Sequence, residues 1–85
     1  MIAPEALQKT LEDGLPGARA QVEDLTGTQD HFRVVVVSDA FDGKLPLARH
    51  RMVYAALGSL MDATVHALTL QTDTPTEHAA RPAVG

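Results

Sequence analysis

The chain has 85 residues, and its 7 Lys and Arg against 11 Asp and Glu give it a formal net charge of -4. This length is enough for one hydrophobic core, so we expect one domain. The sequence has no cysteine, which excludes disulfides, thiolate nucleophiles and metal sites built only from cysteine. The negative net charge disfavours a nucleic-acid backbone as a partner.

The sequence also bears on the location of the protein. No apolar run approaches the roughly 20 residues that a helix needs to cross a bilayer. The first residues, MIAPEALQK, lack the basic start and the apolar block of a secretory signal. We therefore expect a cytoplasmic protein without membrane contact.

The first predicted element is a short amphipathic helix in the segment APEALQKTLEDG. Leu7, Leu11 and Leu15 follow one another at i, i+4 spacing. Pro4 stands where a proline is tolerated in the first turn of a helix. Gly14 is expected to end the helix in a left-handed cap.

Two strands are predicted next, joined by the turn TGTQD. Apolar and polar side chains alternate in residues 18–25, which is typical of a half-buried strand. Residues 31–38, HFRVVVVS, are β-branched or apolar at almost every position, so we expect them to form the central strand. The two-residue period puts Phe32 on the core face and His31 on the opposite face.

A second helix is predicted from Pro46 through ARHRMVYAALGSLMD, and Gly58 is expected to weaken it or divide it in two. At about 100° per residue, His50, Val53 and Tyr54 fall on its apolar arc. The neighbouring positions 49 and 51 are arginines at the two flanks of that arc.

A third strand is predicted at residues 65–72, where the apolar face begins at His66. Residues 73–85 contain two prolines, small residues and no apolar period, so we expect a flexible C-terminal tail after a single domain at residues 1–72. The order of elements, α-β-β-α(α)-β, predicts an α+β fold. In this fold a small three-stranded mixed sheet has helices packed on one face.

Four histidines, at positions 31, 50, 66 and 78, are the only soft metal ligands in the sequence. No two of them have the spacing that puts two imidazoles on one helix face. Glycine-rich phosphate loops and the common nucleophile and zinc-protease motifs are absent from the sequence, so we do not expect an enzyme. His50 is interpreted either as a packed helix residue or as a surface ligand, and His66 either as a strand-edge histidine or as a metal ligand.

Residues 22–75 resemble the BolA family, through five motifs that occur in the family's order. The motifs are the strand HFRVVVVS, Phe41-Asp42-Gly43, Arg49-His50-Arg51-x-Val53-Tyr54, His66-Ala67-Leu68, and Thr74-Pro75. The resemblance implies a K-homology-like fold of the second topology, which agrees with the order of elements given above.

The resemblance also implies a function. BolA-like proteins partner monothiol glutaredoxins, as apo complexes or as heterodimers bridged by a 2Fe-2S cluster, in cluster trafficking or in iron and redox regulation. The resemblance implies that His66 is a cluster ligand, and that the other ligands come from the glutaredoxin cysteine, from glutathione and from the loop between the first two strands. In this sequence that loop has no His or Cys, so His31 at its end is the candidate for the second ligand. His78 stands where many members have a tryptophan.

Two alternative functions remain. The first is a DNA-binding transcriptional regulator of the BolA type, with Lys44, Arg49, His50 and Arg51 as the nucleic-acid-binding residues. We favour the interpretation of the basic group as a solvated helix edge, and the Gly-x-x-Gly loop of nucleic-acid-binding K-homology domains is absent from the sequence. The second alternative is a cofactor-free homodimerisation domain that uses the outer face of the sheet.

Overall fold

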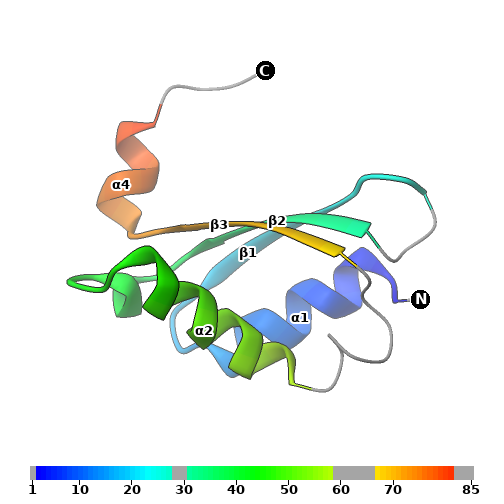
Figure 1. Ribbon diagram of the computed structural model, residues 1–85, viewed down its shortest axis with the longest axis horizontal. Helices are drawn as coiled ribbons and strands as arrows, with labels where there is room; N and C mark the ends of the chain where they lie inside the picture. Colours follow the sequence, from blue (N-terminus) through cyan, green and yellow to red (C-terminus); the bar gives the residue numbers. More distant parts are fainter. Residues whose placement is uncertain (1, 28–30, 59–66, 82–85) are drawn as a thin grey trace.

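The computed structural model describes residues 2–27, 31–58 and 67–81 of the chain (Figure 1). The elements follow one another as α1 (Pro4–Gly14), β1 (Arg19–Asp24), β2 (His31–Val37), the short 3-10 helix η1 (Asp39–Phe41), α2 (Pro46–Leu57), β3 (Ala67–Asp73) and α4 (Pro75–Ala80). None of the helices in these described ranges has the length and apolar character that a bilayer crossing requires.

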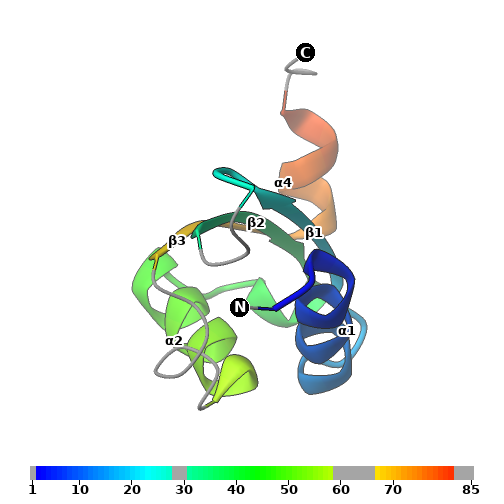
Figure 2. The same cartoon turned by 90° about the vertical axis from the view of Figure 1, so that its right-hand side faces the viewer.

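The three strands form one mixed sheet in the order β1-β2-β3, as the sequence predicts. β1 and β2 are antiparallel, whereas β2 and β3 are parallel and are connected through α2. Figure 2 shows α1 and α2 side by side beneath one face of the sheet, which confirms the predicted layers. α4 stands on the other side of the sheet, at the end of β3.

The core lies between the sheet and the two helices α1 and α2. In β2, the alternate residues Phe32, Val34 and Val36 are fully buried. They meet buried side chains from the other elements, which are Leu7, Leu11, Leu15, Ala20, Phe41, Val53 and Leu57. Each fully buried large aliphatic or aromatic side chain contributes about 1.5–3 kcal/mol, so the alternation in β2 fixes which face of the sheet the helices cover.

α1 begins and ends where the sequence predicts, but the role of Gly14 differs from the prediction. Gly14 lacks the positive φ of a left-handed cap. Gly14 is instead the last helical residue, and the C-cap is Leu15, whose N–H donates to the Leu11 carbonyl at 3.1 Å and whose side chain is buried. A Cβ atom at Gly14 would lie 2.9 Å from the Cβ of Ala56, so this glycine permits the close approach of α1 and α2.

α2 has an apolar face that is rotated from the predicted arc. Val53 and Leu57 are buried, as predicted, but Tyr54 is 41% exposed and His50 is half-buried at the edge of the face. Met52 and Ala56 pack against the core in their place, and Ala56 lies close to Gly14 of α1. The helix ends at Gly58, which has φ of 57°, and the predicted continuation at residues 59–62 lies outside the described residues.

The first half of the predicted tail, residues 73–85, contains regular secondary structure that the sequence pattern did not predict. β3 continues through Asp73, and α4 follows directly. Thr74 and Glu77 form a capping box, in which each side chain accepts a hydrogen bond from the backbone N–H of the other residue. α4 has no buried residue, so the helix arises from capping and charge and not from an apolar stripe. Residues 82–85 lie outside the described residues.

Candidate functional site

His31, one of the two predicted metal ligands, is the first residue of β2. It is half-buried and lies on the face of the sheet opposite to Phe32, as predicted. Its carbonyl accepts a hydrogen bond of 2.9 Å from the N–H of Leu25, which holds the start of β2 against the end of β1.

The parallel register places the start of β3 beside His31. His31 and Ala67 are register partners, and the next pair, Phe32 with Leu68, carries the two strands into the core. Ala67 directly follows His66 in the sequence, and His66 itself lies outside the described residues. The register thus places His31 beside the residue that follows His66 in the sequence. Nowhere in residues 2–27, 31–58 and 67–81 do three or more His, Cys, Asp or Glu side chains form a group able to hold a metal ion.

Arg49, one of the four predicted nucleic-acid-binding residues, links α2 to β3 and α4 through hydrogen bonds. Its side chain is only 11% exposed, and it donates to the carbonyls of Lys44 at 2.8 Å and of Thr72 at 3.2 Å. Two further hydrogen bonds, of 2.6 and 3.1 Å, go to the Glu77 carboxylate. The hydrogen bond to Glu77 is the main reason that the pKa of Arg49 is raised and the pKa of Glu77 is lowered. The guanidinium also lies 5.9 Å from the centre of the Phe41 ring.

The other three basic candidates are only partly brought together. Lys44 and half-buried His50 line, with Arg49, an open groove of about 620 Å³ between the start of α2, β3 and α4. Arg51 is exposed and is not among the residues that line this groove. The structure therefore does not bring the four residues together as one basic surface, because the guanidinium of Arg49 is already held by Glu77.

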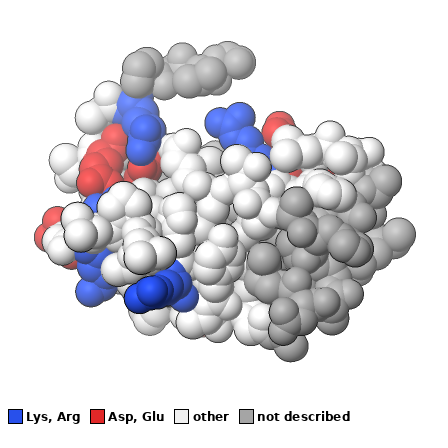
Figure 3. Space-filling model, viewed as in Figure 1, with Lys and Arg blue, Asp and Glu red and all other residues white. Residues whose placement is uncertain are grey.

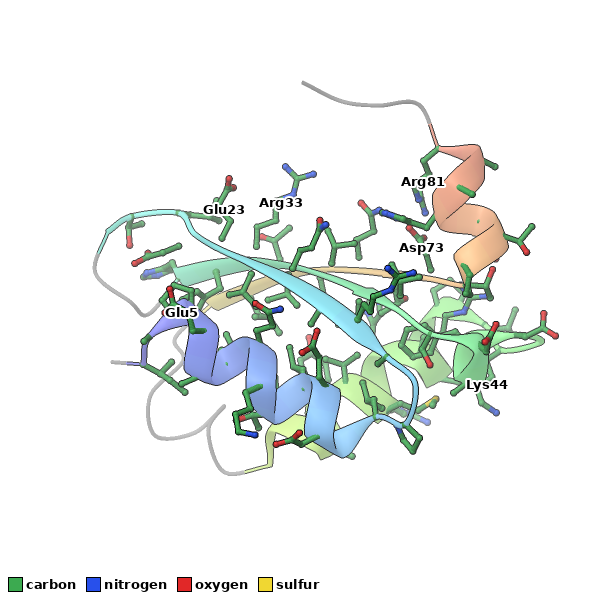
Figure 4. All side chains as sticks on the ribbon, turned by 180° about the vertical axis from the view of Figure 1, so that it is seen from behind. Glu5, Glu23, Arg33, Lys44, Asp73 and Arg81 are labelled. Atoms are coloured by element: carbon green, nitrogen blue, oxygen red, sulfur yellow. The ribbon has the colours of Figure 1, made fainter. Side chains whose placement is uncertain are left out.

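Asp73 is the polar residue that sequence reasoning missed. Its carboxylate is fully buried and accepts hydrogen bonds from Arg81, at 2.7 and 2.5 Å, and from Gln71, at 2.9 Å. Nδ1 of His78 lies 3.5 Å away. The hydrogen bond from Arg81 is the main reason that the pKa of Asp73 is lowered to about 2. Figure 4 shows Asp73 and Arg81 facing each other at the foot of α4. The sequence signal was the capping box at Thr74, which predicts a helix that returns charged side chains to the end of β3.

Charged side chains gather at the α4 end of the molecule. Figure 3 shows acidic and basic groups interleaved there, while the middle of the same face is mostly uncharged. The ion pairs at this end include Arg49 with Glu77 and Arg81 with Asp73. Because the charges are paired, this end of the molecule is not a single-sign surface that would attract polyanions.

Comparison with known proteins gives consistent results. A family model described as BolA-like protein matches residues 7–77. The mouse protein named BolA-like protein 1 is 40% identical over 81 residues, which cover 95% of this chain and 55% of the mouse protein. The Escherichia coli K12 protein named DNA-binding transcriptional regulator BolA is 52% identical over 48 residues, which cover 56% of this chain and 46% of that protein.

The fold agrees with these sequence relationships. A solved structure of a BolA protein homologue from Coxiella burnetii superposes with a TM-score of 0.82 at 39% identity and covers 93% of this chain and 99% of the other. The chain spans about half the length of the curated mouse and E. coli relatives. Motifs, strand register and sequence relationship all lead to one assignment, and the chain belongs to the BolA-like family.

Proposed function

We propose that this BolA-like chain acts through a partner, a monothiol glutaredoxin, and shares a 2Fe-2S cluster with it in cluster trafficking or in iron and redox regulation. The observation that carries the proposal is the register of His31 with Ala67, one residue after His66. His31 and the residue that follows His66 in the sequence are therefore neighbours on adjacent parallel strands, which supports a site to which both histidines contribute.

The donor chemistry of the chain fits this role. The chain has no cysteine, so we propose that its contribution to an iron-sulfur cluster comes from imidazole nitrogens. The family resemblance implies that the remaining ligands are thiolates of the glutaredoxin cysteine and of glutathione. Neutral imidazoles in place of thiolates raise the reduction potential of a cluster and make its ligation sensitive to protonation. His31 is suited to act as a ligand because the next residue, Phe32, is fully buried and fixes the backbone from which the imidazole projects.

The test is reconstitution of the complex with a monothiol glutaredoxin and glutathione. Native mass spectrometry reports the heterodimer, and visible circular dichroism and paramagnetic resonance of the reduced sample report the cluster ligands. We expect His66→Ala, and to a smaller extent His31→Ala, to change the cluster spectra while the apo heterodimer still forms. His50→Ala is the matched control, because His50 is half-buried on α2 and away from the strand starts. Unchanged spectra in His66→Ala with altered spectra in His50→Ala would reverse the assignment.

One observation favours a second candidate, which is DNA binding. The E. coli relative is named a DNA-binding transcriptional regulator, and Lys44 and Arg51 of this chain are exposed and able to contact phosphates. The candidate ranks second because Arg49 is held by Glu77 and because the chain carries a net negative charge.

A further inference from the structure

β1 forms one edge of the sheet. Within the described parts of the chain, β2 pairs with one side of β1 and no strand pairs with the other. The hydrogen bond from Leu25 N–H to His31 O shows that the odd-numbered residues of this segment face β2. The backbone groups of Ala20 and Val22 therefore face outward. In agreement with this direction, the Ala20 N–H donates to Oε2 of Glu12 on α1, at 3.1 Å.

The exposed side chains along this edge carry charges that complement those of the same edge in a second copy of the chain. Arg19, Gln21 and Glu23 are all exposed and alternate with the core-facing residues of β1. If two copies of β1 run antiparallel with their centre at Gln21, Arg19 of each copy lies opposite Glu23 of the other. In the same register, the outward backbone groups of Ala20 lie opposite those of Val22 in the second copy, as a hydrogen-bonded pair requires.

We infer that the edge of β1 is a pairing site for the same strand of a second copy of this chain, which joins two sheets into one across a two-fold axis. Charge selects this register, since a shift by two residues places Arg19 or Glu23 opposite Gln21 instead. Neither Arg19 nor Glu23 has an ion-pair partner among the described residues of its own chain, so the second copy supplies one for each.

The opposite edge of the sheet is less suited to a second copy. On β3, the Thr72 carbonyl accepts a hydrogen bond of 3.2 Å from Arg49, and the same guanidinium is held by Glu77 of α4. A strand that paired here would have to displace this brace. On the outer side of β1, the contact between Glu12 and Ala20 links the strand to α1 through one hydrogen bond.

Glu12 competes with a second copy for this pairing site. Its carboxylate occupies the Ala20 N–H that would otherwise donate to Val22 of the second copy. The dimer must replace this contact once in each copy, so wild-type dimerisation is weak and depends on concentration. Removal of the Glu12 carboxylate frees the Ala20 N–H. Because one net hydrogen bond changes an equilibrium constant by a factor of roughly five, Glu12→Ala should raise the dimerisation constant at least by that factor.

The test is a charge swap followed by sedimentation equilibrium from micromolar to millimolar concentration, with far-ultraviolet circular dichroism as the check on folding. Arg19→Glu alone and Glu23→Arg alone each place like charges opposite one another twice per dimer, and should weaken self-association roughly tenfold or more. An equimolar mixture of the two variants should form a heterodimer, and the double variant R19E/E23R should recover the homodimer. Arg51→Glu is the matched control, because Arg51 is exposed on α2 and does not belong to the sheet.

Each outcome decides the inference. Recovery in the mixture, with Arg51→Glu behaving as wild type, supports it. The inference fails if Glu12→Ala stays monomeric at millimolar concentration. It also fails if the dimer is insensitive to the charge swap but is abolished by Val35→Glu, since that result places the contact on the open face of the sheet. The inference does not depend on the glutaredoxin complex, and the measurement contains no cluster.

Discussion

The guanidinium of Arg81 closes on the buried carboxylate of Asp73 through two hydrogen bonds, Nε to Oδ2 at 2.7 Å and Nη2 to Oδ1 at 2.5 Å. Two parallel hydrogen bonds between these groups are among the stronger polar contacts in proteins. α4 buries none of its own residues, so this ion pair and the pair of Arg49 with Glu77 hold the helix at the end of β3.

Asp73→Asn should lower the free energy of unfolding by about 2 kcal/mol, because the buried site loses a charge-assisted pair and keeps a neutral amide beside Arg81. Asp13→Asn is the matched control. Asp13 pairs with Lys9 at 3.1 Å on the exposed side of α1, and its loss should cost less than about 0.5 kcal/mol. Denaturant unfolding of the two variants makes the comparison, and equal losses would show that the burial of Asp73 carries no weight.

The same carboxylate makes stability depend on acid pH. The hydrogen bond from Arg81 is the main reason that the pKa of Asp73 is lowered from 3.8 to about 2 in the folded chain. Between these two values the unfolded state binds more protons than the folded state, so the stabilisation is complete above pH 3.8 and is lost as the pH falls toward 2. The amount is about 2 kcal/mol. The free energy of unfolding, measured as a function of pH, should fall less steeply toward acid pH in Asp73→Asn than in the wild type. An identical pH dependence in the two proteins would contradict the assignment.

The sequence was sufficient to predict the elements that follow an apolar period. HFRVVVVS predicts a central strand because β-branched residues at successive positions are typical of a strand that is covered on one face and partly shielded on the other, and β2 is central. The Leu7, Leu11 and Leu15 spacing likewise predicts α1 and its buried face. In both cases one hydrophobic period determines the type of element and its orientation.

The sequence was insufficient where charge and close approach replace apolar packing. α4 has no apolar stripe, so a search for periodicity misses it although its capping box stands in the sequence as Thr74-Pro75-Thr76-Glu77. The role of Arg49 depends on Glu77, 28 positions away, and no local pattern reveals that contact. For the candidate metal site, the register of His31 with Ala67 became visible only when β3 was paired with β2.

Gly14→Ala tests the close approach of the first two helices. An alanine is ordinarily better than glycine in a helix by about 1 kcal/mol, but its Cβ here would lie 2.9 Å from Ala56 Cβ and 3.3 Å from Ala56 Cα. Because the neighbouring backbone must move, we expect a net loss of about 1–3 kcal/mol. The double variant Gly14→Ala with Ala56→Gly removes the nearest contact and should recover part of this loss. A thermal unfolding series checks both, and a gain in stability in Gly14→Ala alone would contradict the prediction.

Arg49→Lys should loosen α4 without unfolding the core. Lysine keeps the positive charge but cannot reach the Lys44 and Thr72 carbonyls and the Glu77 carboxylate together. We expect faster hydrogen exchange at the N–H of His78, which donates to the Thr74 carbonyl at 2.9 Å, while the amides of β2 stay protected. Arg51→Lys is the control on the same helix, because Arg51 is exposed. Equal exchange in the two variants would show that Arg49 does not brace α4.

The final prediction concerns DNA. Arg49 is committed to Glu77, Arg51 does not share the groove of Lys44 and His50, and the chain has a net charge of -4. We therefore expect only weak binding that falls steeply with added salt and does not discriminate between sequences, since such binding comes from phosphate contacts alone. Fluorescence anisotropy at physiological salt with several duplexes measures this directly. Discrimination of about tenfold or more between duplexes, lost in Arg51→Ala and retained in Lys9→Ala, would place DNA binding above the glutaredoxin complex as the function of this chain.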